Sequence, residues 1–279
     1  MRIMPLEPTL NGLFLKFLMQ DIISNYFALL DFELYKENSK FWVALEENTK
    51  IIGYLLEHDG RIIYLRGNVE CVTELLKMTS LVRPEFNVEP LNIQTVEKFY
   101  ELTNPIGANR DKINVIFGMD VDKKRFSLIA KCFPKKLGTD EFGALERLYR
   151  RFYEEMALGP ITREQIGRIL DRCTKYGVTY GIYYEHDLVS FASGSRIFKD
   201  VAHIAPVYTL PKFRRRGYAT STCSALAREL LNKNERTILF VSENNVPALK
   251  VYRKIGFTKT GHKFLTFFAH KRPRPALTP

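Results

Sequence analysis

The stretch PKFRRRGYAT, from Pro211 to Thr220, places three consecutive arginines before a glycine and an apolar, helix-like segment. It follows the strand-like run VAHIAPVYT, residues 201–209, and so occupies a turn between a strand and a helix. The first amides of a helix lack intrahelical acceptors, and together with the helix dipole they attract anions. Gly217 would let the backbone close on a phosphate because it carries no Cβ. Three interpretations compete: a phosphate-binding turn, a nucleic-acid patch and a solvated basic loop.

Helix and strand patterns flank this turn on both sides. Upstream, we expect helices over residues 142–156 and from Thr162, where Gln165 completes a capping box. Two further strands are expected there, over residues 178–187 and 188–198. Downstream, the pattern predicts a helix over 218–231, a strand over 236–242 and a helix beginning near Asn245.

The first half of the chain repeats the scheme of the second. We expect three strands within residues 41–67, a helix capped by Asn68, a helix near 95–102 and a strand over 112–121. Residues 13–30 are apolar but interrupted by polar side chains, which suits one amphipathic helix. The seam lies between about residues 121 and 139. In this first copy, Gly67 and Asn68 alone join strand to helix, so it lacks the arginine-glycine turn.

Composition sets the class of protein and its preferred partners. The chain has 279 residues, is 46% hydrophobic and 26% charged, and therefore suits a soluble globular protein of two domains. Its net charge of +11 and pI of 9.4 favour an anionic partner: nucleic acid, a membrane surface or a phosphorylated cofactor. No apolar run of membrane-spanning length and no signal-peptide pattern occur, so we expect a cytoplasmic protein, a monomer or homodimer, without membrane contact.

The cysteines and histidines are scattered along the sequence. The spacing predicts neither a zinc site nor a redox pair, and no metal is expected. Reduced, buried cysteines would act as small hydrophobic residues. The four cysteines are Cys71, Cys132, Cys173 and Cys223.

Two motifs together point to a family. Arg214, Gly217 and Ala219 fit the pattern Arg/Gln-x-x-Gly-x-Gly/Ala, which by itself is short enough to arise by chance. The later stretch NNVPALKVYRKIGF, residues 244–257, supplies a second motif in the right order and structural context. With both motifs, the second half resembles the GNAT superfamily of acyl-CoA-dependent N-acyltransferases.

The resemblance implies an α/β fold of tandem GNAT-like domains, each a mixed, mostly antiparallel twisted sheet flanked by helices. Residues 1–125 would form a degenerate copy and residues 126–279 the acetyltransferase domain. The arrangement is similar to that of glycine-N-acyltransferase-like proteins. The first domain would cover the acceptor cleft, complete a shared sheet, recruit a substrate or have a purely structural role. The implied activity is transfer of an acetyl group from acetyl-CoA to a primary amine, and no metal takes part.

The resemblance also implies a coenzyme site. Backbone groups of Val207 and Thr209 would bond the pantetheine arm, and Pro206 would mark where the sheet splays apart to admit that arm. Asn245 would contact pantetheine or only cap its helix. The expected coenzyme-binding set is Val207, Tyr208, Thr209, Arg214, Arg215, Arg216, Gly217, Tyr218, Ala219, Thr220, Asn245 and Tyr252.

The implied catalytic residues are Tyr252 and His203. Tyr252 would protonate the leaving thiolate, or it would only pack on the sheet. An alkyl amine of pKa ~10.4 is mostly protonated at neutral pH, so a base should help. Related enzymes use a glutamate on the strand that holds His203, which has none here. His203, Glu185 or His186 at a turn expected nearby, and water relayed to backbone remain alternatives for the base.

Two rival functions follow from the same sequence. The positive charge suits a basic nucleic-acid- or ribosome-associated module, although no groove-reading motif is present and nucleic acid is the less favoured partner. A GNAT-shaped sensor would bind acetyl-CoA without turnover. Under the enzymatic interpretation the acceptor stays open among small amines, amino acids, antibiotics and protein amino groups.

Overall fold

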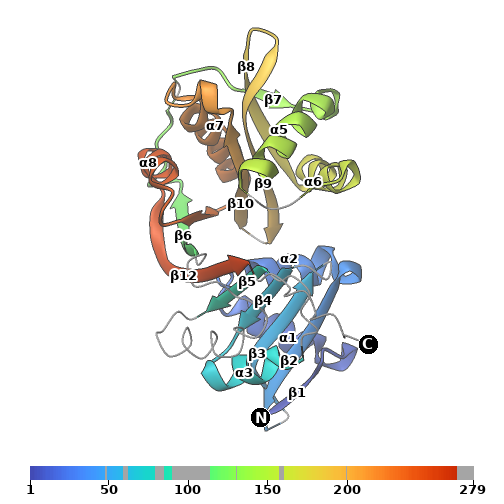
Figure 1. The fold of residues 1–279 in the computed structure, drawn as a ribbon. Helices are drawn as coiled ribbons and strands as arrows, with labels where there is room; N and C mark the ends of the chain where they lie inside the picture. The colour runs from blue at the N-terminus through green and yellow to red at the C-terminus, as the bar shows by residue number, and fades with distance from the viewer. Residues whose placement is uncertain are drawn as a thin grey trace, which may run out of the picture. The chain divides into compact units, whose positions relative to one another are not determined.

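The computed structural model describes residues 1–47, 49–58, 62–78, 85–89, 114–129, 131–156, 160–198 and 200–268. Figure 1 shows two regions in which helices pack on a sheet. The helix expected near residues 95–102 lies outside the described residues. The helices are α1 (Asn11–Met19), α2 (Tyr26–Leu34), α3 (Val69–Leu76), α5 (Phe142–Glu155), α6 (Arg163–Tyr176), α7 (Tyr218–Lys233) and α8 (Val246–Ile255). Short 3₁₀ turns are η1 (Pro8–Leu10), η2 (Lys36–Asn38), η5 (Thr139–Glu141) and η6 (Pro211–Phe213).

The strands follow the alternating apolar pattern of the sequence. Residues 201–209 and 236–242 form strands with the bounds expected for them. The strands are β1 (Arg2–Pro5), β2 (Ser39–Glu46), β3 (Lys50–His58), β4 (Ile62–Arg66), β5 (Glu85–Glu89), β6 (Asn114–Asp122), β7 (Lys135–Leu137), β8 (Gly177–Tyr184), β9 (Asp187–Phe198), β10 (Val201–Thr209), β11 (Arg236–Ser242) and β12 (Thr258–Phe268).

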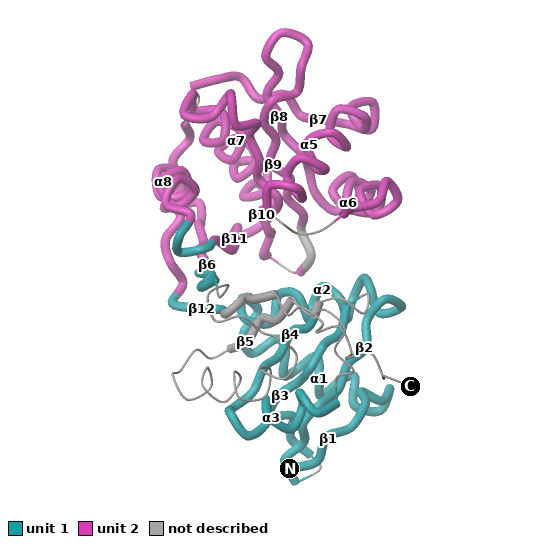
Figure 2. Tube along the Cα trace, viewed as in Figure 1, with its two compact units in different colours: residues 1–118, 242–244, 261–279 teal, residues 119–241, 245–260 magenta. Residues whose placement is uncertain are grey.

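The chain divides into two compact units (Figure 2). The first comprises residues 1–118, 242–244 and 261–279, and the second comprises 119–241 and 245–260. Strands β6, β11 and β12 therefore carry residues of both units. From the sequence, the boundary between the two GNAT-like domains is expected at residues 125/126. The compact units do not test that boundary, so it stays a prediction.

The first unit contains the strand order β1-β2-β3-β4-β5-β12, antiparallel except for the parallel pair β4 and β5. Helix α3 lies on this sheet because its apolar stripe, including Val72 and Leu75, packs against Leu55 and Leu65. Asn68 caps α3 as expected, since its side chain accepts a hydrogen bond from the amide of Cys71 at 2.8 Å.

The single helix expected over residues 13–30 is wrong. The chain forms α1 and α2 with a turn between them. Asp21 holds that turn, because its carboxylate accepts hydrogen bonds from the amide and hydroxyl of Ser24 at 3.2 and 2.6 Å. A short acidic side chain that bonds nearby backbone groups competes with helix continuation.

In the second unit, the strand order β11-β10-β9-β8-β7 is antiparallel apart from the parallel pair β10 and β11. Helices α7 and α8 pack on one face and α5 and α6 on the other (Figure 1). Period-two alternation explains this division: Ala192 of β9 belongs to the α7 face, and its neighbour Phe191 to the α5 face. Thr162 and Gln165 form the expected capping box of α6.

The fold class is confirmed: α/β, with mixed and mostly antiparallel strands flanked by helices. Most predicted strands and helices of both halves are present within the described residues. In the part of the chain that the structure describes, no helix has both the length and the apolar character needed to cross a bilayer.

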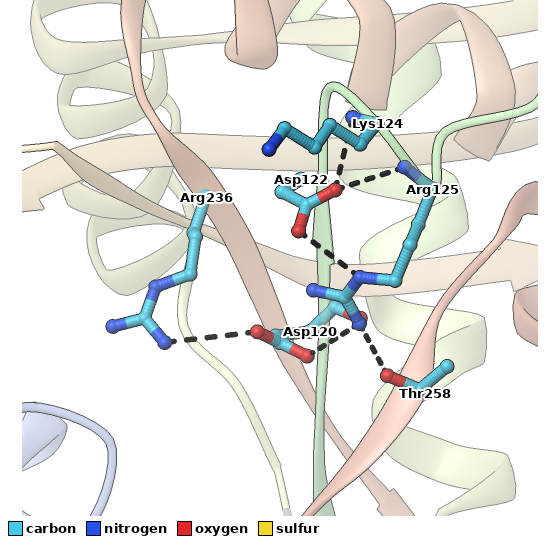
Figure 3. A network of polar contacts seen from close by, with 6 residues as sticks. All are labelled: Asp120, Asp122, Lys124, Arg125, Arg236 and Thr258. Carbon is cyan, nitrogen blue, oxygen red and sulfur yellow. Dashed lines mark hydrogen bonds and ion pairs between the residues drawn. The ribbon is translucent and has the colours of Figure 1, made fainter.

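A polar network fixes the turn after β6 (Figure 3). Arg125 bonds Asp120 at 3.0 Å, Asp122 at 3.1 Å and the hydroxyl of Thr258, and Arg236 lies 3.7 Å from Asp120. Hydrogen bonding to Asp120, supported by Asp122, raises the pKa of the Arg125 guanidinium. Burial alone would lower this pKa, but its effect is the smaller one. The network therefore joins the ends of β6, β11 and β12 within the second unit.

Candidate active site

Strands β10 and β11 separate partway along their length. They pair only from Val201 to His203, opposite Arg236 to Ile238. Beyond that point β10 keeps its pairing with β9 as far as Thr209 but has no partner on its β11 side. An unpaired strand edge presents backbone N–H and C=O groups to a ligand. Pro206 lies in this separated stretch, where a residue without an N–H removes no ladder bond.

The arginine-glycine turn connects this open edge to α7. Arg215 and Gly217 have φ angles of 64° and 86°, so the backbone turns sharply ahead of the helix. No side chain caps α7, and its first intrahelical bond runs from the amide of Ser221 to the carbonyl of Gly217 at 3.0 Å. The amides of residues 218–220 therefore lack intrahelical acceptors and are suited to an anion.

The three arginines of the turn have different surroundings. Arg214 is held by Glu155, at 2.5 and 2.6 Å, and donates to the carbonyl of Thr209 at 2.9 Å. Arg216 covers the rings of Tyr184 and Phe213 at 5.9 and 5.3 Å. Arg215 is exposed and forms neither an ion pair nor a ring contact with any described residue, so of the three arginines it is the least engaged by the protein.

Glu155 links Arg214 to Tyr208. Burial alone would raise the pKa of Glu155, but hydrogen bonds from Arg214 and Tyr208 outweigh it and hold the pKa below its usual range. Burial, followed by its hydrogen bond to Glu155 at 3.0 Å, raises the pKa of Tyr208 to about 12. Both side chains thus keep their charge states at neutral pH, and the turn is fixed to β10 and α5.

Tyr252 lies on α8, on the sheet face covered by α7. Its side chain is 8% exposed and packs against Phe257, with ring centroids 5.9 Å apart. Burial raises the pKa of Tyr252 well above its usual range, and the nearby Cys223 adds to the effect. Burial likewise raises the pKa of Cys223 to about 12. This environment therefore disfavours negative charge on both phenol and thiol groups.

His203 is the last residue of β10 that pairs with β11. Its neighbours Ala202 and Ile204 belong to the core cluster that contains Tyr252, so alternation places His203 on the opposite sheet face. There its ring stands 5.4 Å from that of Phe240. The site residues Tyr252 and His203 thus approach the sheet from different sides.

The alternative bases Glu185 and His186 are exposed in the turn that joins β8 to β9. His203 pairs with Ser195, eight residues along β9 from Asp187. At ~3.3 Å per residue this is about 26 Å of strand. The expectation that this turn lies near His203 is therefore wrong.

Asn245 is the N-cap of α8. Its side-chain oxygen accepts a hydrogen bond from the amide of Ala248 at 3.2 Å. The capping role expected for it is therefore present, and contact with pantetheine stays a prediction.

Comparison with known proteins places this geometry in context. Residues 179–265 match the family model described as FR47-like protein. A GCN5-related N-acetyltransferase from Sphaerobacter thermophilus is 13% identical, with 98% of this chain and 96% of that chain covered and a TM-score of 0.65. A tandem GNAT protein from the clavulanic acid biosynthesis pathway is 13% identical over 98% and 99% of the two chains, with a TM-score of 0.61. The chain has the tandem GNAT fold.

Another similar solved structure is that of a Drosophila protein. It is 14% identical, covers 95% of this chain and 98% of its own, and has a TM-score of 0.66. No curated protein matches the sequence. The resemblance to GNAT proteins inferred from the two motifs is thus confirmed at the level of the fold.

The parallel strand pairs of the two units differ within the described residues: β10 and β11 separate, whereas β4 and β5 do not. In the first unit all five residues of β4 pair with all five of β5, from Ile62–Glu85 to Arg66–Glu89. The turn before α3 is also filled, because Asn68 caps the helix and the sulfur of Cys71 lies 2.6 Å from where a Cβ on Gly67 would be. At the corresponding place in the first unit, β4 therefore presents no unpaired edge towards β5, and the helix that follows, α3, is capped.

Sequence reasoning missed Glu155 as the partner of Arg214. The two residues lie 59 positions apart, on α5 and in the turn after η6, and no local pattern connects them. Within the described residues, no three His, Cys, Asp or Glu side chains are grouped as metal ligands.

Proposed function

We propose that the protein is an acetyl-CoA-dependent N-acetyltransferase whose site lies in the second unit. The observation that carries the proposal is the loss of pairing between β10 and β11 after His203, directly ahead of the uncapped N-terminus of α7. An open strand edge followed by free helix amides suits a ligand with an amide-bearing arm and a diphosphate. The acetyltransferase names of the similar structures agree with this assignment.

The bound coenzyme would use these groups in order. Backbone groups of Val207 and Thr209 would bond the amides of the pantetheine arm along the free edge of β10. The amides of residues 218–220 and the side chain of Arg215 would bind the diphosphate. Arg214 would hold the turn in place rather than contact the coenzyme, because its guanidinium is already bonded to Glu155.

The reaction would be direct attack of a neutral primary amine on the thioester carbonyl. The new C–N bond forms as the C–S bond breaks, the amine nitrogen loses a proton, and the coenzyme leaves as its thiol. Deprotonating an alkyl ammonium at pH 7 costs about 4–5 kcal/mol. His203, or water relayed to the backbone, would accept that proton from the sheet face opposite to Tyr252.

Tyr252 would give its phenolic proton to the leaving sulfur. With usual pKa values, transfer from tyrosine to a thiolate is uphill by about 2 kcal/mol. Burial raises the pKa of Tyr252, which alone would worsen this mismatch. Burial acts in the same way on a thiol in this place, since it raises the pKa of the neighbouring Cys223 to about 12. A thiolate formed beside Tyr252 would be desolvated too, so donor and acceptor would shift in the same direction.

Thiol release from acetyl-CoA, measured with a panel of amines and peptides, tests the proposal. Tyr252→Phe should lower kcat by at least about tenfold while changing acetyl-CoA affinity by less than about twofold, because the lost proton acts only in the transition state. Tyr176→Phe is the control, since Tyr176 is an exposed tyrosine at the end of α6. Equal kcat in both variants would remove Tyr252 from the mechanism.

Binding measurements separate the rival functions. Stabilisation by acetyl-CoA without thiol release from any amine would indicate a sensor. Steeply salt-dependent RNA binding, with no thermal shift from acetyl-CoA, would indicate a nucleic-acid module.

A further inference from the structure

The segment between β6 and β7 is fastened to the first turns of α7. We define the connecting segment as residues 127–129 and 131–133, the trace that joins β6 to β7 past α7 in Figure 1. The amide of Cys132 donates to the hydroxyl of Ser221 at 3.1 Å, and the amide of Ile129 donates to that of Ser224 at 2.8 Å. Residues about 90 positions apart are thereby held side by side.

Lys131 lies directly against the turn that precedes α7. A Cβ placed on Gly217 would stand 3.5 Å from Cδ and 3.7 Å from Cβ of Lys131. The Lys131 side chain is exposed and forms no ion pair with any described residue. Glu155 pairs with Arg214, and both Lys212 and Arg216 lie over the Phe213 ring. Among the described residues, Arg215 and Lys131 are thus the cations at this turn with neither an acidic nor an aromatic partner.

Phe133, on the other side of Cys132, is 96% exposed. Cys132 itself packs inward with Phe213 and Tyr218, so the segment is anchored between the two exposed side chains. An aromatic ring with almost no protein contact, beside a cation and free helix amides, is suited to stacking on a base.

We propose that the connecting segment binds the nucleotide end of the coenzyme, with Lys131 pairing with a phosphate and Phe133 stacking on the adenine. This inference rests on the proposed function, which supplies a ligand with a diphosphate at Gly217. Coenzyme A carries a diphosphate and a 3′-phosphate, and the Lys131 ammonium could form the same ion pair with either of them. The segment would thus determine affinity for the nucleotide without touching the thioester.

Calorimetric titration of the full chain with CoA tests the role of Lys131. Lys131→Ala should weaken binding by about threefold to tenfold, as expected for one hydrogen-bonded charge contact. Lys123→Ala is the matched control, because it removes the same charge from an exposed lysine in the turn after β6 and should change binding by less than about twofold.

Shortened ligands identify the phosphate. If Lys131 pairs with the 3′-phosphate, Lys131→Ala and the unaltered protein should bind 3′-dephospho-CoA equally well. If Lys131 pairs with the diphosphate, the two proteins should differ with 3′-dephospho-CoA and bind only S-acetylpantetheine equally well. Phe133→Ala should weaken CoA by about fivefold or more and leave 4′-phosphopantetheine unchanged, and Phe133→Trp should retain CoA binding.

The outcomes separate two kinds of failure. If the unaltered protein binds no CoA, the proposed function fails and takes this inference with it. If the unaltered protein binds CoA and Lys131→Ala matches Lys123→Ala, or if the penalty persists with S-acetylpantetheine, the inference alone is overturned. Equal affinities of Phe133→Ala and the unaltered protein would remove the adenine contact.

Discussion

Alanine at three glycines of the second unit separates backbone strain from steric conflict. Gly217 has φ +86°, and an added Cβ would meet only the flexible side chain of Lys131 at 3.5 Å. Gly217→Ala should therefore lower the free energy of unfolding by about 1–2 kcal/mol, the strain of a left-handed alanine. Gly167 lies inside α6 with nothing within 4 Å of its Cβ position, so Gly167→Ala should add about 0.5–1 kcal/mol of stability.

Gly256→Ala should be much more damaging. Its φ of +104° imposes the same strain, and in addition its Cβ would lie 2.0 Å from the carbonyl oxygen of Arg125. Relief requires the backbone at Arg125 to move by about 1 Å, which disturbs its hydrogen bonds to Asp120 and Asp122 (Figure 3). At ~1 kcal/mol for each such bond, the total loss should be about 3–4 kcal/mol.

Urea unfolding of the three variants, followed by far-ultraviolet circular dichroism, measures this order. Gly167→Ala identifies the transition that belongs to the second unit, because α6 lies wholly within it. If Gly256→Ala lowers the free energy of unfolding no more than Gly217→Ala does, the backbone after β6 moves at no energetic cost, and the packing argument is refuted.

Three further predictions concern the ion pairs and the two copies. Glu155→Gln should lower the tyrosinate titration midpoint of Tyr208 from about 12, read at 295 nm, while the half-exposed pair with Arg214 contributes only about 0.5–1 kcal/mol to unfolding. Burial acts to raise the pKa of Asp21, but hydrogen bonds from His262 and Ser24 outweigh it and lower the pKa. The stability that Asp21 contributes is therefore fully present above pH ~4 and declines as the pH falls further, so the difference in urea unfolding between Asp21→Asn and the unaltered protein should be constant from pH 6 to about 5 and shrink steadily below pH ~4. Calorimetry with CoA should give one site per chain, and two sites would contradict the closed first copy.

Local patterns predicted the secondary structure around the site. The sequence alone places the bounds of β10 and β11, because apolar residues bounded by turn residues identify buried strands without any tertiary information. The capping box of Thr162 and Gln165 was predictable for the same reason: donor and acceptor lie three residues apart.

Contacts between distant residues were not predictable in this way. The pairing of Glu155 with Arg214, and the fastening of Cys132 to Ser221, join positions that no periodicity relates. The break at Asp21 was missed for a different reason. Hydropathy alone favoured one helix, whereas a single carboxylate that bonds the amide and hydroxyl of Ser24 outweighed it.

The contrast between the two copies follows from how much of each parallel strand pair is bonded. In the first unit β4 and β5 pair along their whole lengths, so every inward-facing backbone group of the pair already has a protein partner. In the second unit, three residues of β10 pair with β11 and the remaining six do not. Unpaired backbone groups are costly unless water or a ligand bonds them, and water competes poorly once an apolar arm fills the space. The separation of β10 and β11, beside a fully paired β4 and β5 in the first unit, therefore favours the proposed coenzyme site over packing within the sheet as its explanation.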